Sequence, residues 1–199
     1  MTREGLIDIG EQLMARHGIY GVNLQRIRTE ARVRNRSAIN YHFGDRRGLV
    51  MAIMHRHRSA IDDERHRLVD LLERQGEVTV RGLVEAAVVP LAARLKTESG
   101  RNFLIILSEV TFRTGSERAY APSEPDSSSV VRLNEMLFER IAGSRARRRH
   151  RIGEFDLMVA ILVADIARSV NRGDQSVAQG RRRVRELIGP LTAALVGSR

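Results

Sequence analysis

The sequence predicts an all-α protein, and three observations support that fold class. Aromatic residues make up only 4% of the chain, whereas strands are usually rich in aromatic and β-branched side chains. Only four prolines interrupt 199 residues, and helix formers such as Leu, Ala and Arg are abundant. In most segments apolar residues recur at i, i+3, i+4 and i+7, the spacing of an amphipathic helix. We therefore expect about nine helices, grouped in a three-helix N-terminal domain at residues 1–47 and a larger helical domain at residues 48–199.

Composition and charge restrict the classes of protein and site. The formal net charge of +10 favours a polyanionic partner. Of the 34 basic residues only Lys96 is a lysine, a bias that we attribute to a GC-rich genome. Without cysteine, neither disulfides nor thiolate metal sites can form. No apolar run of signal-peptide length begins the chain, and the most apolar stretch, 157–167, is too short to span a bilayer and contains Asp165. We expect a cytoplasmic protein without a membrane segment.

The first predicted helix covers residues 3–17. Its apolar face is formed by Leu6, Ile9 and Leu13. Gly18 is placed to end this helix, because glycine adopts the left-handed backbone of a helix C-terminus without strain. Thr2 and Arg3 stand at its start, where free backbone N–H groups favour a phosphate. A solvated helix end explains the same two residues equally well.

Residues 23–43 predict two short helices joined by a basic turn. Asn23 is a good N-cap for the first helix, because its side-chain oxygen can accept a hydrogen bond from a free N–H. The apolar residues of that helix share one face and are Leu24, Ile27 and Ala31. In the turn, residues 32–36, Val33 is the only apolar side chain, so it can fill the junction while the arginines point away.

The second short helix, residues 36–43, has an apolar back and a polar front. Ile39 and Phe43 lie four residues apart on the back. The front carries hydrogen-bond donors and an aromatic ring, namely Arg36, Ser37, Asn40 and Tyr41, with Ala38 and His42 on the flanks. Such a helix suits the major groove of DNA, where Arg pairs with guanine, Asn pairs with adenine, and Ala or Tyr can contact a thymine methyl.

Residues 34–49 read Arg-Asn-Arg-Ser-Ala-Ile-Asn-Tyr-His-Phe-Gly-Asp-Arg-Arg-Gly-Leu and resemble the recognition-helix region of the TetR family of bacterial transcriptional regulators. The resemblance continues upstream over residues 6–21. It implies a helix-turn-helix whose second helix reads DNA. Two departures stand out, since Arg32 takes the place of the usual turn glycine and the turn is one residue longer than the commonest form.

On this interpretation each polar residue of the N-terminal domain receives a role. We assign base contacts to Arg36, Ser37, Ala38, Asn40 and Tyr41. We assign phosphate contacts to Thr2, Arg3, Gln25, Arg34, His42 and Arg46.

Asp45 is placed to cap a long helix that runs from residue 46 to about residue 74. The middle of this helix is polar nearly all round, so we interpret it as a solvated waist. Four of its side chains are of types that bind metals, namely His55, Asp62, Asp63 and His66. However, His55 and His57 point in opposite directions on a helix. We therefore favour charge pairing at i, i+4 and predict no metal site.

The central part of the chain predicts three more helices and two loops. Thr79 caps a helix that reaches Leu95, within which Pro90 predicts a kink. A second helix begins at Gly100 and a third covers residues 128–142. The two loops are expected at residues 114–129 and 144–151. The second loop is rich in arginine and serves either as an extra phosphate-binding arm or, the interpretation we favour, as a solvated segment.

Two helices at residues 154–171 and 176–196 close the chain, and each has a wide apolar stripe. Neither stripe has an obvious partner within one chain, so we expect a two-fold four-helix interface that makes a homodimer. The resemblance to the TetR family implies the same, because members of that family typically dimerise through their last two long helices.

Apolar residues of the central helices predict either a ligand pocket or a solid core. They are Leu91, Leu95, Phe103, Ile106, Leu107, Val110, Met136, Leu137, Phe155 and Met158. The resemblance implies a pocket for a small-molecule effector of unknown identity, because the family typically binds an inducer there.

The motifs of common enzymes are missing, including the nucleophile elbow, the phosphate loop and the zinc-protease helix. Glu109 and Asp165 are acids in apolar helices, but Arg113 and Arg168 are near enough in sequence to pair with them. We therefore expect no enzyme activity and no cofactor.

Taken together, these features predict a homodimeric, sequence-specific DNA-binding regulator, a repressor that a small molecule releases from a double-stranded DNA operator. One alternative is a nucleic-acid-binding protein that ignores sequence and uses its arginine clusters. The other is a ligand-binding or enzymatic helical bundle with a vestigial N-terminal domain.

Overall fold

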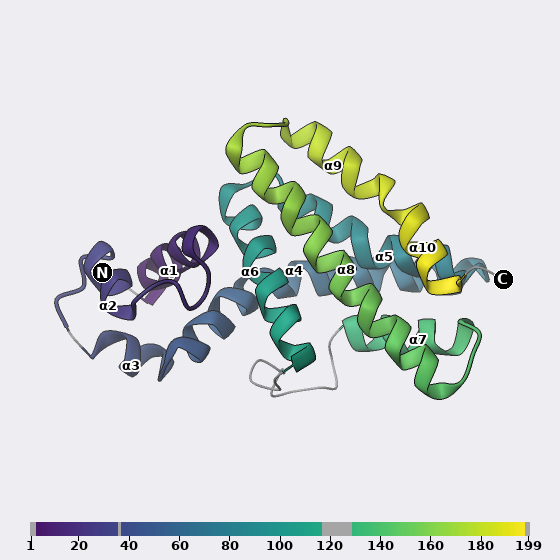
Figure 1. Cartoon of the computed structure of the whole chain (residues 1–199), viewed down its shortest axis with the longest axis horizontal. Coiled ribbons are helices and arrows are strands. Elements are labelled where there is room, and N and C mark those ends of the chain that lie inside the picture. The colour runs from purple at the N-terminus through teal and green to yellow at the C-terminus, as the bar shows by residue number, and fades with distance from the viewer. Residues whose placement is uncertain (1–2, 36, 117–128, 198–199) are drawn as a thin grey trace.

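The computed structural model describes residues 3–35, 37–116 and 129–197. This part of the chain contains ten helical segments and no strand, so the predicted all-α class is confirmed. A small group of helices at one end, α1–α3, is joined by the long helix α4 to a larger helical bundle (Figure 1). We call α1–α3 with the first turns of α4 the head, and the remainder the body. No helix in the described residues is both long enough and apolar enough to cross a membrane.

The head forms where the sequence places caps. Its helices are α1 (Arg3–His17), α2 (Leu24–Glu30) and α3 (Ala38–Phe43), followed by α4 (Arg46–Gln75). The Asn23 side chain accepts a hydrogen bond from the backbone N–H of Gln25, and Asp45 accepts one from Gly48, both over 2.8 Å. Gly44 ends α3 with φ 75°. The predicted caps at Asn23 and Asp45 are confirmed, while α3 begins at Ala38 rather than at residue 36, which lies outside the described residues.

The turn between α2 and α3 contains an unusual backbone conformation. Arg32 has φ 52°, in the left-handed region that favours glycine. This is the position at which the TetR family usually carries glycine. The turn is held by Arg28, whose Nη1 donates to the carbonyl oxygen of Val33 over 2.9 Å. That local hydrogen bond offsets part of the strain, which costs about 1 kcal/mol for a non-glycine residue.

The core of the head is completed by a helix of the body. Ile27, Ile39 and Leu49 are fully or almost fully buried there, and so are Ile106 and Val110 of α6 (Glu98–Ser116). The helix α4 crosses the expected domain boundary at residues 47 and 48 without a break. The head and the body therefore share two helices.

Glu109 of α6 fixes this junction. Its Oε2 accepts a hydrogen bond of 2.9 Å from the backbone N–H of Ile19, just after α1. The pairing with Arg113 that sequence spacing predicts involves a side chain outside the described residues. The contact found in the structure joins residues 90 positions apart in the sequence, so local spacing did not indicate it.

The body consists of five further helices packed around α4 and α6. They are α5 (Val80–Arg94), α7 (Ser129–Arg140), α8 (Arg145–Arg172), α9 (Val177–Glu186) and α10 (Ile188–Val196). In Figure 1, α8 crosses the front of the body, with α9 and α10 beside it. The predicted cap Thr79 is confirmed, because its side chain accepts a hydrogen bond of 3.0 Å from Gly82.

The arginine-rich segment 144–151 is a helix, so the predicted loop is wrong. Ser144 caps α8, and its hydroxyl accepts from the backbone N–H of Arg147. The guanidinium of Arg148 donates to the carbonyl of Gly143 over 2.8 Å, and that of Arg151 reaches the carbonyl of Val196 at the end of α10. The Val196 carbonyl belongs to a distant part of the chain brought near by folding, so a charge run alone could not indicate it.

Other predicted boundaries also shift. The helix expected at Gly100 begins at Glu98 and extends to Ser116, into the expected loop, and most of that loop lies outside the described residues. The helix expected over 176–196 is interrupted at Leu187. Pro190 explains the interruption, because it has no N–H to donate to the carbonyl four residues earlier.

The apolar stripes of the last helices find partners inside the chain, contrary to our expectation. Phe155 and Val163 of α8 are at most 2% exposed, and so are Val184 of α9 and Leu191 of α10. Helix α8 packs mainly on α6, and α9 and α10 pack on α5. Most of the surface that suggested a dimer is therefore used by the monomer's own core.

The polar middle of α4 is not a solvated waist. His57 and Arg65 are only 6% and 9% exposed, in line with the buried Ile61. Each has a buried partner, which explains why a polar residue is tolerated there. His57 Nε2 lies 2.9 Å from the Oε2 of Glu11 in α1, a carboxylate that is itself 2% exposed, and Arg65 donates to a backbone carbonyl of α5.

Replacement of His57 should destabilise the whole fold. The variant His57→Ala leaves the carboxylate of Glu11 buried without its closest partner, so we expect a loss of about 3 kcal/mol in the free energy of unfolding. Urea unfolding followed by circular dichroism measures this loss. His150→Ala is the matched control, because His150 forms an ion pair with Glu154 that is exposed to solvent. Equal, small effects of both variants would contradict a stabilising role for the buried pair.

Candidate functional site

The outer surface of α3 presents several polar side chains. Asn40, Tyr41 and His42 are exposed, and the ring of Tyr41 is 82% accessible and packs edge-to-face on the ring of His42 at 5.0 Å. Ser37, just before α3, is also exposed. Ala38 is 5% exposed and belongs to the core of the head, so its predicted base contact is wrong. On the back of the helix Ile39 is buried as expected, whereas Phe43 is only half-buried.

A hollow of about 310 Å³ lies between α2 and α3. It is lined by Leu24, Gln25, Arg28, Ile39 and Asn40. Two amide side chains, from Gln25 and Asn40, thus share one concave surface although they belong to different helices. Among the site residues predicted from sequence, these two are brought together by the turn.

Cationic side chains surround this surface, and one is already engaged. Arg3 is exposed and its guanidinium lies 5.3 Å from the ring centroid of Phe43, so the start of α1 is beside the end of α3. Arg34 is exposed in the turn. Arg46, in contrast, donates to the carbonyls of Ile19 and Val22, each over 2.6 Å. It fastens the start of α4 to the loop after α1.

Two of the predicted contact residues, Thr2 and Arg36, lie outside the described residues. Of the others, Ser37, Asn40, Tyr41 and His42 are exposed on α3 or just before it. The exposed Arg3 lies beside the end of that helix, and the exposed Arg34 lies in the turn before it. Side chains that offer donors and acceptors on a protruding helix can reach base edges in a major groove, and exposed guanidiniums beside it can pair with phosphates.

Comparison with protein-family models and with curated proteins finds no match to this chain.

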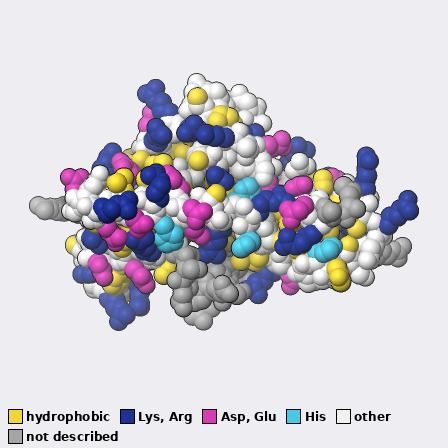
Figure 2. All heavy atoms as spheres, turned by 180° about the vertical axis from the view of Figure 1, so that it is seen from behind, with side chains coloured by type: hydrophobic (Ala, Val, Ile, Leu, Met, Phe, Trp, Pro, Cys, Tyr) yellow, Lys and Arg dark blue, Asp and Glu magenta, His cyan; other side chains and the backbone are white. Residues whose placement is uncertain are grey.

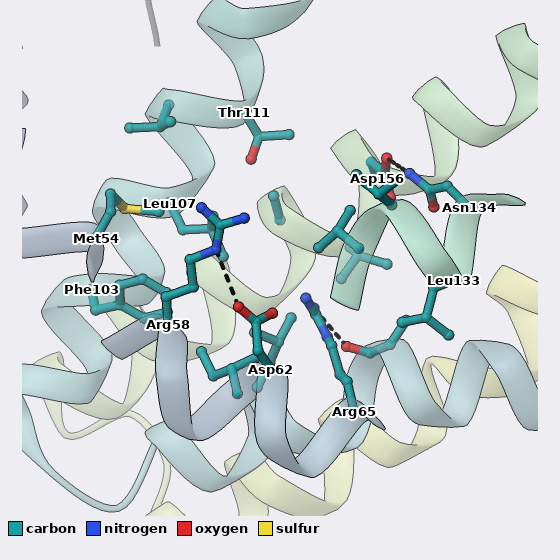
Figure 3. A pocket seen from close by; sticks show the side chains of 18 of the residues that line it. Met54, Arg58, Asp62, Arg65, Phe103, Leu107, Thr111, Leu133, Asn134 and Asp156 are labelled. Atoms are coloured by element: carbon teal, nitrogen blue, oxygen red, sulfur yellow. Dashed lines mark hydrogen bonds and ion pairs between the residues drawn. The ribbon is translucent and has the colours of Figure 1, made fainter. Parts of the chain in front are cut away.

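The second candidate site is a cavity of about 360 Å³ inside the body. Its walls come from α4, α5, α6, α7 and α8 (Figure 3). Five of the ten residues predicted to line a pocket do so, namely Leu91, Phe103, Leu107, Val110 and Phe155. The cavity is therefore between the helices where it was expected.

The other five predicted residues pack away from the cavity. They are Leu95, Ile106, Met136, Leu137 and Met158. Ile106 belongs to the core of the head, and Leu95 and Leu137 are fully buried in the core of the body. Because both sides of a fully buried helix are apolar, hydrophobicity does not say which side faces a cavity.

Sequence reasoning missed the polar residues of the cavity. Arg58, Asp62 and Arg65 line it from α4, beside the apolar Met54. Their spacing of three or four residues places them on one face of the helix. This regular spacing is the sequence pattern that could have indicated a polar wall of the cavity. The interpretation of this segment as a solvated waist concealed it.

These polar residues form two hydrogen-bonded pairs and one buried cation (Figure 3). Arg58 Nε lies 3.2 Å from the Oδ2 of Asp62, whose other oxygen accepts from the hydroxyl of Ser129. Across the cavity, Asn134 Nδ2 donates to Asp156 over 2.8 Å. Burial raises the pKa of Asp156 to about 6.

Arg65 is the buried cation of this group. Burial lowers its pKa to about 10, and the nearby charges of Asp62 and Asp156 oppose that shift. The guanidinium therefore remains protonated at neutral pH. Among the described residues, no group of three acidic or histidine side chains is arranged to hold a metal ion.

The raised pKa of Asp156 predicts a pH-dependent cost. Because the folded protein holds this proton more tightly than the unfolded chain, stability is lost as the pH rises from about 4 to about 6. The variant Asp156→Asn removes that cost, so we expect it to gain about 1–3 kcal/mol at pH 7.5 and almost nothing near pH 4. Urea unfolding of both proteins at each pH measures the difference. Asp165→Asn, an exposed position on the same helix, is the control, and a gain that is equal at both pH values would contradict the assignment.

Proposed function

We propose that this chain is a homodimeric, sequence-specific DNA-binding transcriptional regulator, and that it represses until a small molecule occupies the body cavity. One observation carries the proposal. The helix α3 is anchored by Ile39, which is 4% exposed, while Asn40 and Tyr41 next to it project into solvent. A helix held in this way can enter a major groove with its polar front leading.

Base contacts are then made by Ser37, Asn40 and Tyr41, with Arg36 before them. Phosphate contacts come from Arg3, Gln25, Arg34 and His42, which border α3 or lie in the turn. Arg46 is not among them, because its guanidinium holds the loop after α1. Its role is to orient the head rather than to clamp a phosphate.

The cavity and the head share contacts through which a ligand can act. Val110 lines the cavity and is also part of the core of the head. Phe103 lines the cavity and stacks on His57 at 4.6 Å, and His57 pairs with Glu11 of α1. A ligand that binds one arrangement of these side chains more tightly than another shifts the equilibrium between the corresponding head positions. The free energy of that shift cannot exceed the difference between the two binding free energies.

The dimer interface is proposed on the outer face of α8 and α10. Although their inner stripes are buried, Ile161 and Leu162 of α8 remain 44% and 38% exposed. Pro190 and Ala194 of α10 are also exposed, and α10 packs beside α8. A two-fold pairing of this apolar face would present two heads to half-sites about 34 to 36 Å apart.

A second candidate is binding to nucleic acid without regard to sequence. Lys and Arg side chains project from both ends of the molecule and are not confined to the head (Figure 2). Arg145, Arg147 and Arg149 are exposed at the start of α8. This candidate predicts that affinity is insensitive to sequence and falls steeply with salt.

Substitutions in the head separate base reading from phosphate contact. We expect Asn40→Ala or Tyr41→Ala to cost about 1–3 kcal/mol at the cognate operator and to relax its sequence preference. Arg34→Ala is the matched control and should weaken binding to all duplexes alike. It should also reduce by about one the slope of the logarithm of the binding constant against the logarithm of salt concentration. Gel-shift titrations against operators obtained by in vitro selection measure both effects. Unchanged discrimination in Asn40→Ala would refute the base-reading assignment.

The same titrations decide between the candidates. Competition of specific with random duplex at fixed salt should favour the specific duplex if the proposal is right. Equal competition supports the sequence-indifferent alternative, and no binding to either duplex supports a vestigial head.

The proposed dimer makes a separate prediction. At micromolar concentration, light scattering should give twice the mass of one chain, and Leu162→Glu should give the monomer mass, because it places a charge in the apolar face. Leu71→Glu is the control, since Leu71 has similar exposure of 37% but lies on α4. A monomeric wild-type protein would contradict the dimer.

A further inference from the structure

We infer that the ligand of the body cavity is a small apolar monocarboxylate whose carboxylate pairs with Arg65. The inference deepens the proposed function and rests on it for its regulatory meaning, because it names the chemical class of the effector. It is carried by the arrangement of charge in the cavity.

Arg65 is a buried cation without a direct counterion in the described part of the chain. It is 9% exposed and lines the cavity, and its Nη2 donates to the carbonyl oxygen of Ala87 over 3.0 Å. Its Nε is buried and finds no hydrogen-bond partner among the described residues. Since guanidinium has five N–H donors, most of its capacity is unused in a place where an unpaired charge is costly.

The nearby carboxylates are committed elsewhere. Asp62 is engaged by Arg58 and Ser129, and Asp156 accepts from Asn134. Figure 3 shows Arg65 extending from α4 toward the space between these two pairs. Neither acid forms an ion pair with Arg65 in the described residues, although both act on it electrostatically. An anion that enters from outside can pair with Arg65 and leave both existing pairs intact.

The charge and shape of the ligand's polar group follow from the arrangement of Arg65, Asp62 and Asp156. A guanidinium fork matches the two oxygens of a carboxylate, which gives parallel charge-assisted hydrogen bonds. Asp62 and Asp156 both act on Arg65 electrostatically, so they also repel an incoming anion. A ligand whose polar group carries one negative charge is therefore favoured over a phosphate monoester, which carries nearly two.

The remainder of the cavity requires an apolar tail. Its walls include Met51, Met54, Phe103, Leu107 and Val110. Methionine and aromatic side chains adapt to ligands of irregular shape. A volume of about 360 Å³ is at the lower end of the range for small-molecule pockets, which limits the tail to a modest length.

A series of ligands with the same ten-carbon tail and different polar groups tests the inference on the wild-type protein. Decanoate, decanol, decylamine and decyl phosphate are titrated by calorimetry below their aggregation concentrations. We expect decanoate to bind at least about tenfold more tightly than decanol, decyl phosphate to bind less tightly than decanoate, and decylamine to bind least. Equal affinity for decanoate and decanol, or a preference for decylamine, overturns the inference.

Variants of the two cavity arginines locate the contact. Arg65→Met keeps the length of the side chain and should lose about 10- to 100-fold in affinity for decanoate, with the affinity for decanol unchanged. Arg65→Lys should lose less. Arg58→Met is the matched control, since Arg58 lines the same cavity but already pairs with Asp62. Unchanged decanoate affinity in Arg65→Met, or an equal loss in Arg58→Met, contradicts a contact with Arg65.

A gel shift with decanoate keeps the two proposals apart. Tight decanoate binding with no DNA binding would refute the proposed function and leave the ligand class standing. Specific DNA binding with no preference for the carboxylate would refute the ligand class alone. Both are supported if decanoate releases the wild-type protein from its operator and fails to release Arg65→Met.

Discussion

The packing of α6 against α1 is the contact on which the rest of the structure depends. From one side of α6, Ile106 closes the core of the head and Glu109 holds the backbone after α1. From the other side, Phe103 and Leu107 form a wall of the body cavity. Because protein interiors are close-packed, a helix with buried contacts on both sides cannot move at one side alone. A small head, with few residues of its own, is therefore packed against the same helix that lines the body cavity.

Polar groups buried by α4 show two different solutions to the same problem. His57 is satisfied within the chain, because Glu11 supplies a buried carboxylate and Phe103 covers the ring. Arg65, which lines the cavity, donates to one carbonyl and has a buried Nε without a hydrogen-bond partner among the described residues. The first arrangement ties α1 to α4 and contributes stability. The second retains a charge where burial is costly, and this is the observation from which the ligand contact is proposed.

Local chemistry was predictable where a side chain acts on its own backbone. The caps at Asn23, Asp45 and Thr79 are present because such hydrogen bonds need only two to four consecutive residues. The predicted loop at residues 144–151 failed for the opposite reason. Arg151 is stabilised by the carbonyl of Val196 at the end of α10, a partner 45 residues away that no local pattern reveals. Half of the predicted cavity wall was right, since apolar character marks burial but not direction.

By itself the sequence determined the helical class, the caps and the polar front of α3, because periodicity and capping are written in neighbouring residues. Only the tertiary structure decided that Ala38 is buried, that Arg46 holds a loop, and which face of each central helix meets the cavity. The physical reason is that burial and hydrogen bonding depend on partners from distant parts of the chain. Which partners meet depends on how the helices pack together, because each helix buries its apolar side chains against those of other helices.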